Sequence, residues 1–102
     1  MERNIQDSLI PIIKNAIALL DFKDVTEKDI LLDFTKDSRF GDLTTNIALK
    51  LSTSVKKAPL ELAASIVRGI KKYLEKAPIE HDIEEVKVEN AGFINFYLRN
   101  SY

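Results

Sequence analysis

The sequence predicts a small α+β domain over residues 1–102, with three helices packed on one face of an antiparallel sheet of about three strands, in two layers. Apolar residues recur at intervals of three and four over 5–20, 43–55 and 59–74, which is typical of amphipathic helices. After Pro78 the period changes to two, with Val86 and Val88 on one face, and a second strand follows at 93–98, which is typical of half-buried strands. A single domain is expected, because 45% hydrophobic residues suffice for one core and no linker interrupts the pattern.

The first half of the chain is expected to contain one helix, one strand and one loop. The helix covers 5–20, and Pro11 either kinks it or delays its start, because proline lacks the amide donor and clashes with the preceding turn. Residues 30–34 are predicted to form a strand that buries alternate side chains, including Phe34. The charged stretch 35–40 is expected to form a loop.

The second half is expected to contain two helices and a β-hairpin. The second helix is predicted to start at Asp42, whose carboxylate can accept the free amide donors of a first helical turn. Pro59 is predicted to open the third helix, since proline suits the first helical position. The hairpin consists of strands at 86–88 and 93–98, joined by a turn at 90–92.

Composition excludes several classes of function. The chain has no cysteine, which excludes disulfide frameworks, thiol catalysis and zinc fingers, and its single histidine, His81, is expected to be a solvated loop residue. No apolar run approaches the roughly 20 residues that span a bilayer, and no signal peptide is apparent, so a cytoplasmic protein without membrane contact is expected. Since no acid, base, nucleophile or metal set converges, the chain is predicted to be non-catalytic, without cofactor or metal.

Charge is distributed unevenly, although the net charge is only −1. Residues 47–76 contain seven basic and two acidic side chains, whereas residues 77–90 contain five acidic and one basic. A basic face of this kind can contact phosphates, and the candidate contacts are Lys56, Lys57, Lys71, Lys72 and Lys76. The alternative is that this face is only solvated surface.

The last predicted strand carries the clearest candidate site. Burying the even-numbered residues of 93–98 places Phe93, Asn95 and Tyr97 on the opposite face of the sheet. An exposed aromatic ring can stack on an unpaired base, and a neighbouring amide can pair with a base edge. These residue types therefore indicate RNA binding. The alternative is that the first helix or a loop covers Phe93 and that Asn95 stabilises the turn.

Three segments together carry a family pattern. They are Phe40-Gly41-Asp42-Leu43-Thr44-Thr45-Asn46-Ile47-Ala48-Leu49, then Ala58-Pro59 through Ala63, and finally Gly92-Phe93-Ile94-Asn95-Phe96-Tyr97-Leu98. In this order and spacing they resemble the N-terminal appended domain of arginyl-tRNA synthetases, and the resemblance covers nearly the whole chain.

The resemblance implies that the domain contacts the elbow of an arginine-accepting tRNA and reads a base of its D-loop. The residues at the family's reading positions are Asn90, Phe93 and Asn95. The implied partners are this tRNA and the catalytic and anticodon-binding domains of the same enzyme, with the domain itself a monomer.

The family enzyme uses ATP to activate arginine and then transfers it to tRNA. The class I signatures for ATP binding, a His-x-Gly-His type tetrapeptide and a Lys-Met-Ser-Lys type loop, are missing from this sequence. The chain is therefore expected to be a non-catalytic fragment of a larger ligase, with a free-standing paralogue as the alternative.

Two other functions compete with tRNA recognition. A protein-interaction module would dock the face of Phe93 and Tyr97 onto another domain, and replacing Asn95 would separate this from base reading. A single-strand binder of the RRM type also uses strand aromatics, but its basic and aromatic eight-residue motif is absent.

Overall fold

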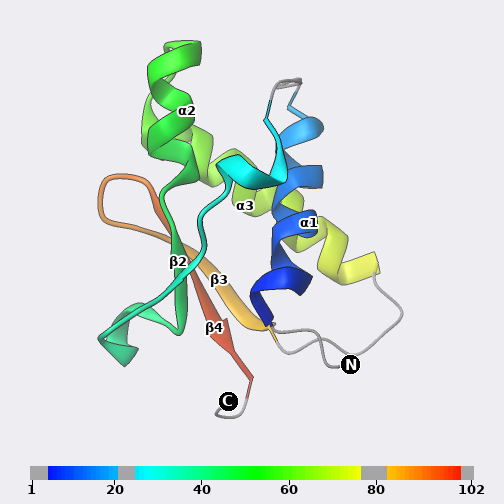
Figure 1. Ribbon diagram of the computed structural model, residues 1–102, viewed down its shortest axis with the longest axis vertical. Coiled ribbons are helices and arrows are strands. Elements are labelled where there is room, and N and C mark those ends of the chain that lie inside the picture. The colour runs from blue at the N-terminus through cyan, green and yellow to red at the C-terminus, as the bar shows by residue number, and fades with distance from the viewer. Residues whose placement is uncertain (1–4, 21–24, 77–82, 100–102) are drawn as a thin grey trace.

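The computed structural model describes residues 5–20, 25–76 and 83–99, and it confirms the α+β class (Figure 1). Its helices are α1 (Ile5–Ala18), α2 (Ile47–Val55) and α3 (Pro59–Lys76). Its strands are β1 (Asp33–Phe34), β2 (Leu43–Thr45), β3 (Ile83–Glu89) and β4 (Phe93–Leu98), and two short 3-10 turns lie at Glu27–Asp29 and Ser38–Phe40. No helix in this part of the chain has the length and apolar character needed to cross a membrane.

The sheet has four antiparallel strands in the order β1-β2-β4-β3, one more than expected. The additional strand is β2, because residues predicted to begin the second helix are paired with β4 instead. Leu43 lies opposite Phe96 and Thr44 opposite Asn95, and α2 begins only at Ile47. The prediction of a helix start at Asp42 was therefore wrong, since cross-strand pairing outweighs a local capping signal.

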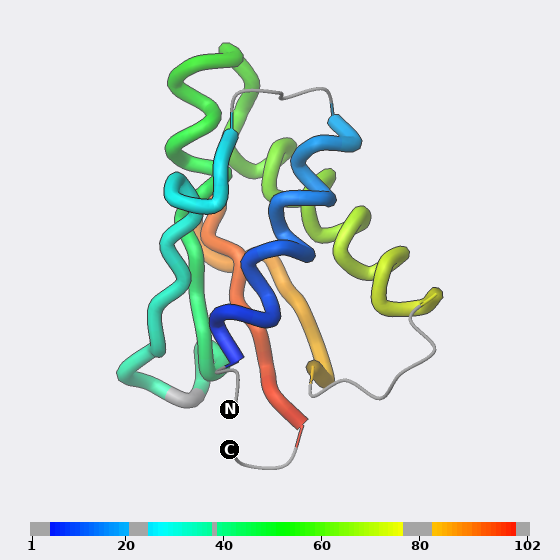
Figure 2. The backbone as a smooth tube through the Cα atoms, turned by 45° about the vertical axis from the view of Figure 1, so that its right-hand side comes forward, coloured from blue at the N-terminus to red at the C-terminus, as the bar shows by residue number. Residues whose placement is uncertain are grey.

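The helices pack beside one another on one side of the sheet. Figure 2 shows α1 and α3 lying side by side, and α1 continues through Pro11 without ending. Gly69 permits this close approach, because a Cβ added there would lie 3.0 Å from the Ala16 Cβ. The expected third helix is confirmed from Pro59 to Lys76.

The core lies between the two layers. Its largest fully buried side chains include Ile13 and Ile17 of α1, Ile66 and Ile70 of α3, and Phe96 of β4. This part of the fold follows the periodicity of the sequence.

Phe34 departs from the expected pattern. Ile30 and Leu32 are buried as predicted, but the Phe34 side chain is 61% exposed. The predicted strand over 30–34 is reduced to the two residues of β1, and both are exposed. The alternation of buried and exposed side chains therefore ends at Leu32.

The corner at Gly41 and Asp42 is fixed directly onto β4. The Asp42 amide donates to the Phe96 carbonyl oxygen at 2.8 Å, and the Asp42 carboxylate accepts from the Leu98 amide at 2.8 Å. Gly41 has a φ of +87°, and a Cβ there would lie 2.7 Å from the Phe96 carbonyl oxygen. Only glycine fits this left-handed position without moving the backbone of β4.

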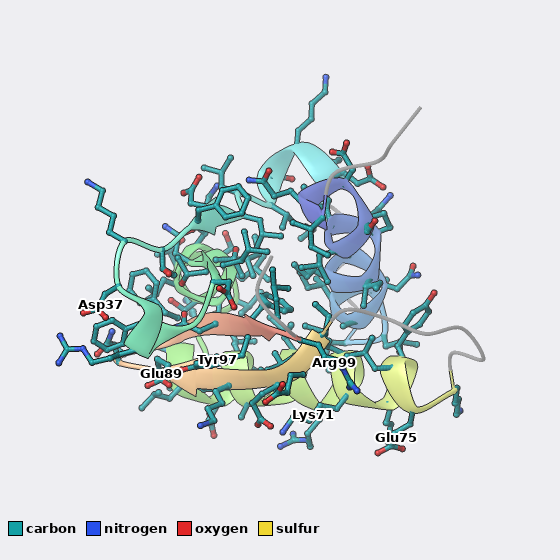
Figure 3. The ribbon with its side chains drawn as sticks, turned by 90° about the horizontal axis from the view of Figure 1, so that it is seen from below. Asp37, Lys71, Glu75, Glu89, Tyr97 and Arg99 are labelled. Atoms are coloured by element: carbon teal, nitrogen blue, oxygen red, sulfur yellow. The ribbon has the colours of Figure 1, made fainter. Side chains whose placement is uncertain are left out.

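Tyr97 of β4 contacts the loop that precedes Gly41. Its hydroxyl lies 3.1 Å from Glu89 Oε2 and 3.2 Å from the Arg39 carbonyl oxygen, and can donate to one of them at a time. Lys87 Nζ lies 5.3 Å from the centroid of the Tyr97 ring. Burial, then the hydrogen bond to Glu89 and the nearby negative charge, raise the pKa of Tyr97. Figure 3 shows Tyr97 and Glu89 close together beneath this loop.

Two left-handed positions should respond to substitution with opposite signs. Gly41→Ala is expected to lower the free energy of unfolding by roughly 2–4 kcal/mol, because it adds strain and a clash with the β4 backbone. Lys56, with a φ of 57° just after α2, is exposed. Lys56→Gly should therefore raise stability by roughly 0.5–1 kcal/mol. Urea denaturation of both variants checks this, and a neutral Gly41→Ala would contradict the tight corner.

The hydroxyl of Tyr97 should stabilise the fold only while it is protonated. Tyr97→Phe is expected to cost about 0.5–1.5 kcal/mol at neutral pH through the lost hydrogen bond. The folded protein holds the phenolic proton more tightly than the unfolded chain, so this difference should shrink as the pH rises above about 10. Denaturation of both proteins at neutral pH and at about pH 11 tests this, and an equal difference at both would contradict it.

Candidate nucleic-acid interface

The face of β4 that points away from the helices carries the predicted site residues. Ile94, Phe96 and Leu98 are buried toward the helices as expected, which leaves Phe93 and Asn95 on the other face. Asn95 sits in the middle of the sheet, in register with Thr44 of β2 on one side and Lys87 of β3 on the other.

A hollow of about 380 Å³ lies over this face and brings residues from three regions together. Its volume falls within the range of small-ligand pockets in proteins. It is lined by Phe34, Thr35, Lys36, Asp37, Phe40, Thr44, Asn90, Phe93 and Asn95. The predicted residues Asn90, Phe93 and Asn95 therefore share one hollow.

Three aromatic rings line the hollow. Phe93 is half-buried, whereas Phe34 and Phe40 are 61% and 42% exposed. Large exposed aromatic side chains that gather around one concavity are typical of binding surfaces. The Arg39 guanidinium carbon lies 5.9 Å from the centroid of the Phe40 ring.

Asn95 is the polar residue beneath these rings. It is only 2% exposed, and its Oδ1 accepts a hydrogen bond from the Thr44 hydroxyl at 2.6 Å. The predicted position of Asn95 on the outer face of the strand is confirmed. Its burial on that face was not predicted. The suggested alternative, that Asn95 stabilises the turn, has no hydrogen bond to support it, because in the described part of the chain the Asn95 side chain bonds Thr44 alone.

Asn90 lies at the turn between β3 and β4. It is exposed and has a φ of 54°, a left-handed conformation that asparagine tolerates better than most residues. The predicted turn over 90–92 is therefore confirmed. Gly92 closes it with a φ of +131°, packed so closely that a Cβ would lie 2.9 Å from the Pro59 Cβ.

Tyr97, the fourth predicted RNA contact, does not line the hollow. Its hydroxyl is engaged with Glu89 and the Arg39 carbonyl oxygen, as described above. The structure thus places Tyr97 where it supports the loop that carries Phe40.

The charges lining the hollow are balanced. Lys36 and Asp37 are its two charged lining residues. Hydrogen bonds from the side chain and then the backbone of Arg39 lower the pKa of Asp37, so its carboxylate stays ionised at neutral pH. Arg39 Nη2 lies 2.7 Å from Asp37 Oδ2 and offsets the charge of that carboxylate, so a neutral aromatic ligand meets no unpaired carboxylate in this hollow.

The basic residues predicted to contact phosphates lie elsewhere. Lys71 Nζ lies 3.7 Å from a Glu85 carboxylate oxygen, and Lys71 lines a separate hollow that shares no residue with that of Asn95. Figure 3 shows Lys71 and Glu75 well apart from Asp37, Glu89 and Tyr97. The other four predicted contacts are exposed on α3 or in the segment that precedes it: Lys56, Lys57, Lys72 and Lys76.

Six of the lining residues were not predicted as site residues: Phe34, Thr35, Lys36, Asp37, Phe40 and Thr44. Phe34 was assigned to the core, Phe40 to the loop over 35–40, and Thr44 to the first turn of a helix. The consecutive β-branched residues Thr44 and Thr45 are a strand signal that could have located β2. No local signal reveals that Phe34 and Phe40 line the same hollow as Phe93, because this arrangement depends on the docked corner.

Comparison with known proteins places this chain in a family. Residues 4–98 match the family described as "Arginyl tRNA synthetase N terminal domain". An arginine–tRNA ligase of Listeria welshimeri is 42% identical over 103 residues, covering 100% of this chain and 17% of the relative. One of Bacillus velezensis is 37% identical over 98 residues, covering 95% of this chain and 16% of the relative.

Solved structures agree with the fold. The arginyl-tRNA synthetase of Plasmodium falciparum superposes on 92% of this chain with a TM-score of 0.71 at 20% identity, over 16% of its own length. That of Thermus thermophilus superposes on 94% with a TM-score of 0.69 at 20% identity, over 14% of its own length.

The chain spans about 17% of the length of the ligase of Listeria welshimeri. The region it matches is the N-terminal domain of the family, as the three sequence segments had indicated. The chain belongs to the arginyl-tRNA synthetase N-terminal domain family.

Proposed function

We propose that this chain is the tRNA-recognition domain of an arginine–tRNA ligase and that the hollow over β4 receives one unpaired base of the tRNA D-loop. The observation that carries the proposal is the position of Phe93 and Asn95 in one hollow with two exposed phenylalanines. Phe93 and Asn95 are also residues at the reading positions of the family pattern.

The chemistry of the hollow fits a single nucleobase. Sequence-specific RNA recognition targets loops, whose unstacked bases can stack on aromatic side chains and pair with amides. Phe93 offers the ring and Asn95 the amide, while Phe34 and Phe40 bound the same space. Stacking on such a ring is worth about 1–3 kcal/mol per base.

Phosphate contacts would supplement this base contact. Lys36 is the cation that lines the hollow, and it can approach the phosphates flanking an inserted base. The contacts predicted for Lys56, Lys57, Lys71, Lys72 and Lys76 stay predictions, and they require the tRNA to extend beyond the hollow toward α3. With a net charge of −1, non-specific attraction to RNA is weak.

Catalysis belongs to other parts of the proposed enzyme. The relatives are named arginine–tRNA ligases, and each is about six times as long as this chain. In such an enzyme the catalytic domain activates arginine with ATP, the anticodon-binding domain contacts the other end of the tRNA, and this domain adds affinity and tRNA identity. The rival function, docking of the same face onto protein, predicts no response to D-loop changes.

Replacing Phe93 should weaken tRNA binding selectively. Phe93→Ala is expected to raise the Kd for an arginine-accepting tRNA by about fivefold or more, because the stacking surface is lost. Tyr73→Ala is the matched control, since Tyr73 is a 47% exposed aromatic on α3 that does not line the hollow. Fluorescence anisotropy with labelled tRNA measures both.

The RNA provides the second half of this test. Single abasic substitutions along the D-loop should include one that weakens binding as much as Phe93→Ala does, with no further loss when both changes are combined. If every D-loop substitution leaves the Kd unchanged, or if Tyr73→Ala has the larger effect, the proposed function is wrong.

A further inference from the structure

The side-chain amide of Asn95 is held in one orientation by Thr44. The two residues lie opposite each other on neighbouring strands, and Thr44 Oγ1 is 2.6 Å from Asn95 Oδ1. In the part of the chain that the structure describes, this is the single hydrogen bond of the Asn95 side chain. The Oδ1 end of the amide is therefore hydrogen-bonded within the protein, whereas the Nδ2 end is not.

The unoccupied end is not sealed in the interior. Asn95 is 98% buried, yet none of the described side-chain nitrogen or oxygen atoms is both fully buried and without a partner. Among the described residues the amide nitrogen Nδ2 has no partner, so it must reach solvent, and the hollow is the space that Asn95 lines. A nearly buried donor facing a hollow is a group that a ligand can satisfy.

The direction of the Thr44 bond follows from its length and from proton counting. A separation of 2.6 Å is typical of an O–H···O bond and is shorter than the usual N–H···O range. If the amide were turned over, its nitrogen would donate to Thr44, and the hydroxyl proton would have no acceptor among the described residues. The hydroxyl therefore donates to Oδ1, which leaves Nδ2 as the group that can donate to a ligand in the hollow.

We infer that Asn95 reads its base as a hydrogen-bond donor and that Thr44 is the positioning residue that sets this polarity. The inference rests on the proposed function and narrows the ligand by chemistry. The preferred base presents an acceptor, a carbonyl oxygen or an unprotonated ring nitrogen, toward Asn95. An exocyclic amino group cannot replace it, because two donors would then face each other.

The neighbouring cations do not provide a competing donor beneath the rings. Lys87 is in register with Asn95, but its Nζ lies over the Tyr97 ring and Lys87 does not line the hollow. Lys36 lines the hollow and is exposed, and a flexible lysine discriminates poorly between base edges. The amide of Asn95 is thus the group with a fixed direction.

Atomic substitutions in the RNA test the inference on the unaltered protein. The probe is an arginine-accepting tRNA assembled from synthetic pieces, carrying the analogue at the D-loop position where an abasic nucleotide weakens binding. Replacing the acceptor atom of that base with C–H should raise the Kd by roughly fivefold to tenfold. Deleting an exocyclic amino group, where the base has one, should change it by less than about twofold.

Variants of Thr44 test the positioning role. Thr44→Val keeps the shape but removes the hydroxyl, so the amide can turn over, and the cost of the C–H analogue should fall to within about twofold. Thr44→Ser restores the hydroxyl and should restore the discrimination. The Asn95 side-chain NH₂ resonances should shift on binding in the wild type and the serine variant. Unchanged backbone resonances of Ile94 and Phe96 confirm that each variant is folded.

The outcomes separate this inference from the proposed function. If no abasic substitution in the D-loop weakens binding, the proposed function fails and the inference fails with it. If an abasic substitution weakens binding but loss of the acceptor atom is neutral, or loss of the amino group is the costly change, the inference alone is overturned. Equal discrimination by the wild type and Thr44→Val would also overturn the role of Thr44.

Discussion

The docking of the Gly41 and Asp42 corner onto β4 is the contact on which the site depends. Asp42 bonds β4 twice, through its amide to the Phe96 carbonyl and through its carboxylate to the Leu98 amide. The absence of a Cβ at Gly41 lets the two backbones meet. This corner ends the loop that carries Phe40 and starts the strand that carries Thr44. Without it, neither residue would have a fixed position relative to Asn95.

The three sequence segments of the family pattern are structurally coupled. The first segment supplies Gly41 and Asp42, which are bonded to the third segment along β4. The second supplies Pro59, against which Gly92 of the third segment packs with no room for a side chain. Two glycines and one proline therefore position both ends of β4. Backbone proximity thus explains why these segments belong together, whereas Phe93 and Asn95 line the hollow.

The two faces of the sheet have different roles, and this explains how a small domain can hold such a site. The side of the sheet that faces the helices is filled by the core, including Ile94 and Phe96. The other side is only partly covered, by the loop before the corner, and the hollow is the space that remains. Tyr97 supports that loop from below through its hydroxyl. Burial on one face thus makes β4 rigid enough to present Asn95 in a defined orientation on the other.

Sequence periodicity predicted what depends on local structure. It located α3 and the β3–β4 hairpin, because a helix with a regular apolar stripe and an alternating strand carry their signals within a few residues. It missed β2, which has three residues and exists because Leu43 and Thr44 pair with a strand about fifty residues away.

The candidate site was predicted only in part for the same reason. Alternation along β4 correctly identified the face of Phe93 and Asn95. The contributions of Phe34, Phe40 and Thr44 depend on tertiary contacts that no local pattern encodes. The orientation of the Asn95 amide likewise depends on a residue of another strand.

The most direct test of the account is the detection of nuclear Overhauser effects between the protein and a bound tRNA. Phenylalanine rings would be isotopically labelled, and the D-loop would carry labels on single bases. We expect contacts from the Phe93 ring, together with Phe34 or Phe40, to the protons of one D-loop base. Contacts confined to the lysines of α3, with none to these rings, would contradict the central claim that the hollow binds a base.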